Sequence, residues 1–150
     1  MPVKSFKGIL EDGGKTTISL HTNDGKTGYR IVKFQAIPED PGSAIGEHMV
    51  KIFKTDPTAA PTSTVDFSDQ TLLGCVSIST HSGNLLFNEV IIFDNEIFNQ
   101  DIFVTHIDKA GGAKCNYYIE LEQIDLDLVE QTVATLQSIR SSAQGTGQKS

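Results

Sequence analysis

The feature that most restricts the fold of this chain is a series of short segments in which apolar and polar residues alternate, separated by glycine, proline, asparagine and aspartate. Alternation with a period of two is typical of strands that bury one face. Asp-Gly at 12–13 and at 24–25 supplies the positive φ angles of tight turns. We therefore predict that the chain opens with a β-meander of strands at 3–10, 15–22 and 28–37.

The even-numbered apolar residues of these segments share one parity, which predicts that they face inward. They are Phe6, Leu10, Ile18, Leu20, Val32 and Phe34. Tyr29 and Ile31 have the opposite parity, so the third strand is apolar on both faces. We expect its outer face to be covered by a loop or by a neighbouring chain. A fourth strand is predicted at 47–55, with Val50 and Ile52 inward.

The remaining segments complete an all-β pattern. LLGCVSIS, NEVIIF and two runs within 98–123, which are joined by a glycine pair, add about four strands, for roughly eight in all. Short strands with little helix between them argue against a parallel βαβ fold. We predict a two-sheet antiparallel sandwich that is jelly-roll-like. The segments 38–47 and 55–71 are predicted surface loops.

The C-terminal region departs from this pattern. The parity of the apolar residues changes near Gln123, which predicts a bulge or bend there. Beyond it the apolar spacing becomes helical, and a D-x-x-E capping box at 127–130 favours a short C-terminal helix at about 128–140. Residues 141–150 are predicted to be a disordered tail.

Length and charge exclude some classes of partner. A chain of 150 residues fits one domain, predicted over residues 1–140. Its 19 acidic and 12 basic side chains give a formal net charge of -7, which repels phosphate backbones, so we expect no nucleic-acid partner. No apolar run approaches the roughly 20 residues that span a bilayer, and the first residues lack the features of a secretion signal. We expect no membrane partner, and synthesis in the cytoplasm.

His106 and Asp108 form the most suggestive local pair. They lie two apart on a predicted strand and so project from the same face, which is the geometry that a metal pair uses. Asp101 is close in sequence, but a third ligand would have to come from elsewhere. The other histidines are scattered singly, at His21, His48 and His81. We therefore predict a polar strand end, with no metal and no cofactor.

No catalytic constellation is evident in the sequence. Ser68 and Asp69 have no histidine nearby, and the chain has no G-x-S-x-G elbow. The loop GGA at 111–113 is not followed by a helix, so it is predicted to be a hairpin loop and not a phosphate cradle. Glu120 and Glu122 alternate with apolar residues and are expected on the wet face of a strand. We predict that the protein is not an enzyme and has no catalytic residues.

Two cysteines lack the spacing of a zinc motif or a disulfide framework. Cys75 is predicted to be a small buried hydrophobe, and Cys115 a free thiol that opens a strand.

Aromatic and helical apolar residues are the candidates for a protein interface. Tyr117 and Tyr118 must face opposite ways on a strand, so at most one packs in the core. The helical spacing near the C-terminus adds further candidates to the predicted interface, namely Val129, Val133, Leu136 and Ile139.

Residues 93–140, FDNEIFNQDIFVTHIDKAGGAKCNYYIELEQIDLDLVEQTVATLQSIR, resemble a family of small proteins of marine tailed phages, including phages that infect cyanobacteria. The earlier segments YRIVKFQAIPEDPGSAIGEHMVKIFKTD and VDFSDQTLLG also resemble this family, so the likeness covers most of the chain from Tyr29 onward. Its most recognisable pieces are NEIFNQDIF, NYYIELE and TVATLQSIR. One departure is Val129, which stands where the family pattern has a polar helix cap and leaves Asp127 as the cap.

The resemblance implies a non-enzymatic virion structural protein, an accessory or decoration protein on the capsid exterior that is made in the host cytoplasm. The implied partners are other virion proteins, the major capsid protein first, and copies of the chain itself in a homo-oligomer. It carries over no catalytic residues. Two alternatives remain: a tail or fibre module that binds host-surface glycans through the loops at 38–46 and 55–71, and a metal-dependent enzyme that uses His106.

Overall fold

The computed structural model describes residues 2–41, 45–81 and 84–126. Within these ranges the chain forms strands β1 (Val3–Leu10), β2 (Lys15–Ile18), β3 (Thr27–Pro38), β4 (Gly46–Phe53), β5 (Leu72–His81), β6 (Asn84–Ile92), β7 (Ile102–Asp108) and β8 (Cys115–Asp125). The predicted all-β class is confirmed, and each predicted strand overlaps an observed one, although β2 ends at Ile18 and not at residue 22. The predicted helix at about 128–140 and the predicted tail lie outside the described residues.

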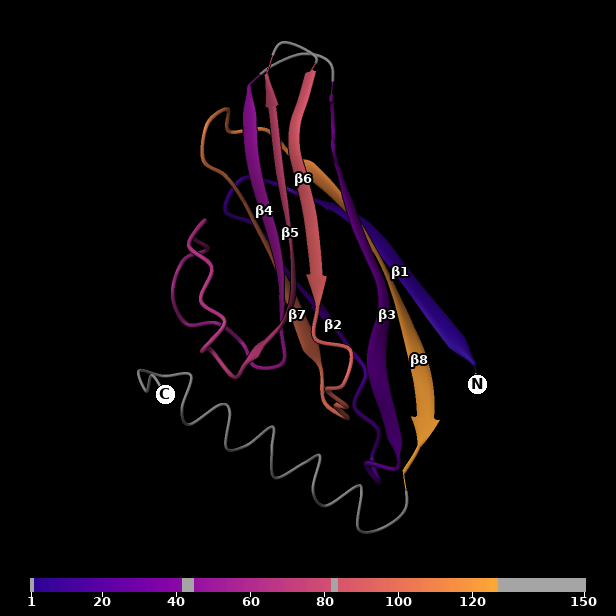
Figure 1. The fold of residues 1–150 in the computed structure, drawn as a ribbon. Coiled ribbons are helices and arrows are strands. Elements are labelled where there is room, and N and C mark those ends of the chain that lie inside the picture. Colours follow the sequence, from indigo (N-terminus) through magenta and orange to yellow (C-terminus); the bar gives the residue numbers. More distant parts are fainter. Residues whose placement is uncertain (1, 42–44, 82–83, 127–150) are drawn as a thin grey trace.

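The strands form two antiparallel sheets that pack face to face (Figure 1). One sheet has three strands in the order β1-β8-β3, and the other has five in the order β2-β7-β4-β5-β6. β3 of the smaller sheet lies against β5 and β6 of the larger one. The predicted two-sheet antiparallel architecture is confirmed.

The predicted opening meander is wrong, although its turns are where the sequence places them. Gly13 and Gly25 adopt positive φ angles of 81° and 66°. However, β1 pairs with β8 and β2 pairs with β7, so the chain passes from one sheet to the other between these strands. The predicted hairpin loop at 111–113, between β7 and β8, also contains a glycine with a positive φ, Gly112 at 70°. That loop joins the two sheets and is not a hairpin. The turn residues determine only the local bend of the chain, whereas the burial of both sheets determines which strand each strand pairs with.

The core lies between the sheets and consists of the inward residues of both. Leu10, Ile18, Leu20 and Phe34 are buried as their parity predicts, and Phe6 packs against the same cluster. In β4, the inward placement of Val50 and Ile52 is also confirmed.

A bulge in β3 reverses which side chains in the first half of the strand face inward and which face outward. The register with β8 shifts between Ile31 and Lys33, so Val32 is 39% exposed whereas Ile31 is 1% exposed. Tyr29, also on the supposed outer face, is buried in the core. The bulge therefore accounts for a strand that is apolar at both parities. No bulge interrupts β8 near Gln123, because β8 pairs with β3 in unbroken register from there to Asp125; the alternative prediction of a bend there stays a prediction.

Candidate functional site

A cluster of buried polar side chains lies between the sheets, at the end of the sandwich where β7 leads to β8. Its members are His48 on β4, His106 and Asp108 on β7, and Cys115 on β8. His48 stands opposite Asp108 in the ladder between β4 and β7, which places it beside His106. Cys115 approaches from the other sheet. One ligand atom each of His48, His106 and Cys115 lies within 4.8 Å of the others.

The hydrogen bonds of the two imidazoles determine where their protons lie. His106 Nδ1 is 2.8 Å from the carbonyl oxygen of Glu11, which can only accept, so this nitrogen carries a proton. When both rings are neutral, His106 Nε2 therefore presents its lone pair, and His48 Nδ1 donates to it over 2.9 Å. The rings are stacked with centroids 5.1 Å apart and planes at 14°. The pair thus forms a defined, directional contact inside the core.

Asp108 is an ionised carboxylate held by backbone donors. Its Oδ1 accepts N–H bonds from Glu47 (3.0 Å), Ala110 (3.1 Å) and Gly111 (3.0 Å), and its Oδ2 accepts one from Ala113 (2.9 Å). Burial by itself would raise the pKa of Asp108, but these four donors outweigh it and lower the pKa to about 2. The carboxylate therefore stays charged while it anchors the turn that follows β7.

Burial disfavours the charged forms of two other members of the cluster, His48 and Cys115. Burial lowers the pKa of His48, and His106 acts in the same direction, while the carboxylate of Asp108 opposes them. His48 Nε2 lies 3.8 Å from Asp108 Oδ2. Burial raises the pKa of the Cys115 thiol to about 12. The cluster thus contains one fixed negative charge, on Asp108, beside a thiol and an imidazole whose charged forms burial disfavours.

Two of the four members of this cluster, His106 and Asp108, are predicted from the sequence to lie together. The placement of His106 and Asp108 on one face is confirmed, but the strand end is buried and not exposed to solvent. Asp101, the other acid close to His106 in sequence, instead pairs with the imidazole of His21 at 2.7 Å. It also accepts the backbone N–H of Leu20 at 2.8 Å.

His48 and Cys115 were not recognised as members of this site. His48 has the inward parity of Val50 and Ile52, which is the one signal in the sequence that it is buried. Its meeting with His106 depends on the register of β4 against β7, which local sequence does not encode. Cys115 is a free thiol, as predicted, and it is also buried.

The two adjacent tyrosines face opposite sides of the three-stranded sheet, as predicted. Tyr117 is buried in the core, with its ring so close to Gly8 that a Cβ there would lie 2.8 Å from the tyrosine hydroxyl oxygen. Tyr118 is half-buried, and its hydroxyl donates to Glu120 Oε2 over 2.6 Å. Only Tyr118 is therefore placed to contribute to a protein interface. The other predicted interface residues lie outside the described part of the chain, namely Val129, Val133, Leu136 and Ile139.

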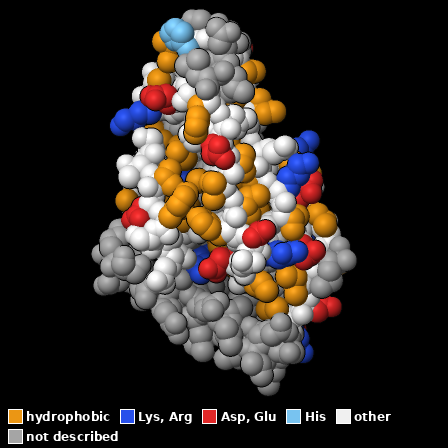
Figure 2. Space-filling view, in the orientation of Figure 1, with side chains coloured by type: hydrophobic (Ala, Val, Ile, Leu, Met, Phe, Trp, Pro, Cys, Tyr) orange, Lys and Arg blue, Asp and Glu red, His pale blue; other side chains and the backbone are white. Residues whose placement is uncertain are grey.

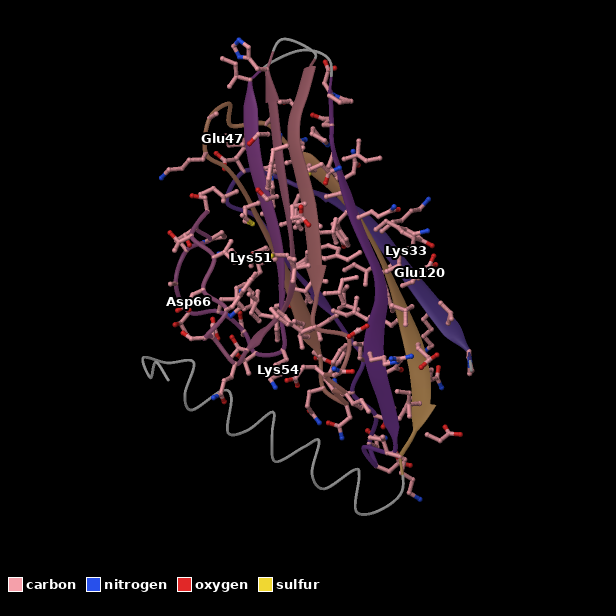
Figure 3. The ribbon with its side chains drawn as sticks, in the orientation of Figure 1. Lys33, Glu47, Lys51, Lys54, Asp66 and Glu120 are labelled. Carbon is pink, nitrogen blue, oxygen red and sulfur yellow. The ribbon has the colours of Figure 1, made fainter. Side chains whose placement is uncertain are left out.

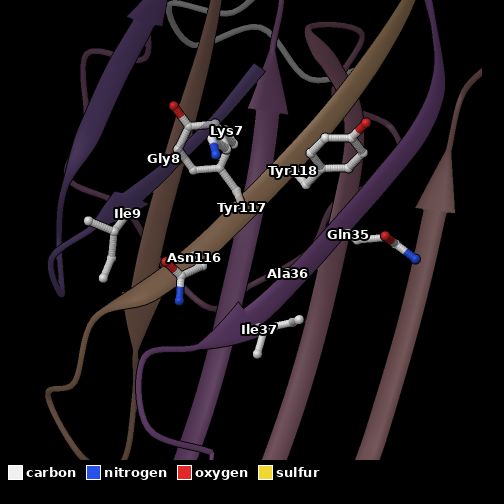
Figure 4. Close-up of a pocket in the computed structure, with 9 residues that line it drawn as sticks. All are labelled: Lys7, Gly8, Ile9, Gln35, Ala36, Ile37, Asn116, Tyr117 and Tyr118. Atoms are coloured by element: carbon white, nitrogen blue, oxygen red, sulfur yellow. The ribbon is translucent and has the colours of Figure 1, made fainter. Parts of the chain in front are cut away.

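A hollow of about 520 Å³ lies over the three-stranded sheet, lined by neighbouring residues of β1, β8 and β3 (Figure 4). Ile9 and Ile37 stand on either side of Asn116 in register, and both isoleucines are exposed. The hollow is shallow, so it suits a protein surface better than a small enclosed ligand.

The loop between β4 and β5 folds over the outer face of the five-stranded sheet and leaves a hollow of about 490 Å³ beneath it. Lys51 points from β4 toward this loop, which also carries Asp66 (Figure 3). Its ammonium donates to the carbonyl oxygen of Thr64, and burial lowers the pKa of Lys51 while Cys75 and Asp69 act against that shift. The predicted surface loop thus covers part of one sheet.

Comparison of the sequence with models of protein families and with curated proteins gives no match. In the part of the chain that the structure describes, no helix is long and apolar enough to cross a membrane.

Proposed function

We propose that this chain is a non-enzymatic structural protein of a phage virion, an accessory or decoration protein on the capsid exterior that acts through protein–protein assembly. Its partners are the major capsid protein and further copies of the chain. Two features support the proposal: the resemblance of residues 93–140 to small virion proteins of marine tailed phages, and an open side of the β-sandwich that is suited to assembly.

The strand order supports a jelly-roll-like wrapping. A jelly roll winds eight strands so that the first pairs with the last and the pairing continues inward to the fourth and fifth. In this chain β1 pairs with β8, β2 with β7, and β4 with β5. The remaining pair of a jelly roll would be β3 with β6. In this chain these two strands lie against each other but belong to different sheets. We therefore interpret the fold as a jelly roll that is open between β3 and β6.

This open side is the observation that carries the proposal. Among the described residues, β3 and β6 each end their sheet without a further strand, apart from a bridge between Tyr29 of β3 and Phe98, and they lie side by side. Phe87 and Val90 of β6 are 49% and 36% exposed, and Val32 of β3 is exposed as well. Figure 2 shows hydrophobic side chains gathered in the middle of this face of the molecule, over the five-stranded sheet. An unpaired strand edge with apolar side chains on it is a template for another strand.

A second copy of the chain fits this edge by symmetry. Two β6 edges related by a two-fold axis run antiparallel, so each supplies the N–H and C=O groups that the other lacks. Phe87 and Val90 project from opposite faces of β6, so each would lie beside the edge of the other copy on its own face of the sheet. Closed association of this kind removes an edge that would otherwise promote uncontrolled aggregation.

The buried cluster gives no support to an enzyme. His48, His106 and Asp108 are each less than 5% exposed, so a substrate would have no surface on which to approach them. Groups that act on a substrate must come within hydrogen-bond reach of it. A role inside the fold therefore suits these side chains better than catalysis.

Analytical ultracentrifugation tests the assembly edge directly. The purified protein should sediment as an oligomer, and Val90→Lys should shift it to the monomer because a charge on the edge opposes strand pairing. Val65→Lys is the matched control, since Val65 has nearly the same exposure, 37% against 36%, but lies in the loop between β4 and β5. A monomeric parent protein, or equal effects of the two substitutions, would contradict the proposed edge.

The virion location needs its own test. Particles of the phage that encodes the chain should contain it after density-gradient purification, as measured by mass spectrometry with the major capsid protein as the internal standard. Its absence from purified particles would refute the proposed location whatever the oligomeric state.

Glycan binding is a second candidate, favoured by the hollow under the loop between β4 and β5. Threonines and aspartates line it together with Phe53, and such polar groups can hydrogen-bond sugar hydroxyls. An array of host-surface polysaccharides tests this candidate. Selective binding that Phe53→Ala reduces would favour it, and a flat response would dismiss it.

A further inference from the structure

We propose that His48, His106 and Cys115 bind one soft or borderline transition-metal ion, Zn²⁺ or copper, and that this ion joins the two sheets. The inference goes beyond virion assembly and does not depend on it. It rests on three ligand-bearing side chains that come from three strands and converge in the core. Imidazole nitrogen and thiolate sulfur together are the ligands preferred by these ions.

The ligand atoms are already close to the required spacing. His48 Nδ1 and His106 Nε2 are 2.9 Å apart. Two metal–nitrogen bonds of about 2.0 Å at a tetrahedral angle place their nitrogens about 3.3 Å apart, so a small opening of the pair admits the ion. Cys115 Sγ, on the opposite sheet, lies within 4.8 Å of one ring nitrogen of each histidine. No strand has to move to a new register.

The surroundings of both histidines match the outer shell of a metal site. Metal-bound histidines almost always donate their second ring N–H to a carbonyl or a carboxylate. The second nitrogen of His106, Nδ1, donates to the carbonyl of Glu11 over 2.8 Å. The second nitrogen of His48, Nε2, faces the charged carboxylate of Asp108 at 3.8 Å. The outer-shell acceptor of His106 is therefore in place, whereas His48 Nε2 has to move closer to Asp108 in order to donate to it.

Binding can be written with its protons balanced. The proton on His48 Nδ1 leaves and one is taken up at Nε2, next to Asp108, so the imidazole remains neutral. The thiol of Cys115 releases one proton to solvent and becomes the thiolate ligand. Its present contact, with the carbonyl of Asn116 at 3.6 Å, is long, so little is given up when the sulfur turns to the ion.

The site is structural and not catalytic, because its three ligands are at most 3% exposed. Three protein ligands leave a fourth coordination position on the metal. A water molecule fills this position on zinc, whereas on copper it remains a weak axial contact. An ion held there ties β4 and β7 of one sheet to β8 of the other. It compensates for the cost of placing two imidazoles and a thiol in the core.

Metal analysis and spectroscopy of the tag-free protein test the proposal. After stripping with a chelator, the protein is incubated separately with Zn²⁺, Co²⁺ or Cu²⁺, and bound metal is counted by mass spectrometry. We expect one equivalent of Zn²⁺ or of copper, and a thiolate charge-transfer absorption with Co²⁺ or Cu²⁺. Competition between Zn²⁺ and copper then identifies which of the two the site prefers. Binding of less than a tenth of an equivalent in every arm would overturn the proposal.

A matched pair of cysteine variants locates the ion. Cys115→Ser should abolish the charge-transfer absorption and weaken binding by more than the roughly 10- to 100-fold that loss of an outer-shell partner costs. Cys75→Ser is the control, because Cys75 is also buried and free but lies outside the cluster. It should bind as the parent does, and equal binding by both variants would refute the assignment.

X-ray absorption of the unmodified protein keeps the test decisive if Cys115→Ser fails to fold. The spectrum should show one sulfur and two imidazole nitrogens around the metal. A shell without sulfur, or with more than one, would contradict the proposed ligand set.

Discussion

At the scale of single residues, Asp108 organises the end of the sandwich where the polar cluster lies. A buried charge is tolerated only when donors replace the water that it loses. The four backbone N–H groups around this carboxylate do so, and they come from β4 as well as from the turn after β7. Asp108 therefore couples the conformation of a loop to the alignment of two strands.

Acid should destabilise the metal-free protein in a window set by Asp108. Its pKa falls from 3.8 to about 2 on folding, so its contribution is complete above pH 3.8 and is lost as the pH falls through 2. At about 1.4 kcal/mol per unit, the shift corresponds to roughly 2 kcal/mol of the free energy of unfolding. Urea unfolding between pH 5 and pH 2, in the presence of a chelator, measures this.

Asp108→Asn supplies the control for that window, because it removes the titrating group and keeps its shape. The variant should be less stable than the parent at pH 5, and the difference should shrink toward pH 2. A constant difference across the range would contradict the assigned role of the carboxylate.

Gly111 is required because another backbone segment lies against it. A Cβ there would lie 2.4 Å from the carbonyl oxygen of Ile45, a backbone atom that cannot rotate away. Gly111→Ala should therefore cost about 2 to 3 kcal/mol of unfolding free energy. Gly13→Ala should cost about 1 kcal/mol, since Gly13 has a positive φ but no atom within 4 Å of a Cβ. Thermal and urea unfolding compare the two, and the reverse order would contradict this packing.

At the scale of elements, the bulge in β3 decides which side chains of that strand enter the core. Because one residue is added against β8, Ile31 turns inward and Val32 turns outward. The same strand lies at the open edge of its sheet, beside β6. The bulge therefore shapes both the core and the proposed assembly side.

Alanine substitution of two neighbours tests the bulge. Ile31→Ala should reduce the free energy of unfolding by about 2 to 5 kcal/mol, because Ile31 is fully buried. Val32→Ala should cost less than about 0.5 kcal/mol, as is usual for exposed side chains. Equilibrium urea unfolding gives both values. The opposite ranking, which a regular strand would produce, would show that the bulge is misplaced.

The strands were predictable from the sequence, but their partners were not. The alternation around Ile18 and Phe34 encodes which face is buried, and Gly13 and Gly25 encode the turns. Neither pattern specifies whether a turn returns the chain to the same sheet, since that depends on burying both sheets at once. The candidate site was missed for the same reason, because His48 and Cys115 reach His106 through strand pairing and sheet packing.

At the scale of the whole molecule, β8, the last strand of the described residues, joins the two ends of the fold. β8 is the central strand of the smaller sheet and pairs with β1 and β3, from the other end of the chain. It also brings Cys115 to the histidines. The smaller sheet therefore depends on contacts between distant parts of the sequence.

Folding should accordingly be slow for a domain of this size. Two-state proteins dominated by long-range strand pairing fold in roughly milliseconds to seconds, because loop closure precedes the stabilising contacts. Stopped-flow refolding from urea should show its main phase in that range. A complete recovery of signal within microseconds would contradict a fold that is built on non-local pairing.

The central claim, that this chain is a structural part of the virion, is tested most directly by a density map of the intact phage particle. The account predicts density for the β-sandwich on the outside of the capsid, in contact with the major capsid protein and with a second copy along β6. A map in which every protein component is assigned and none of them is this chain would contradict it.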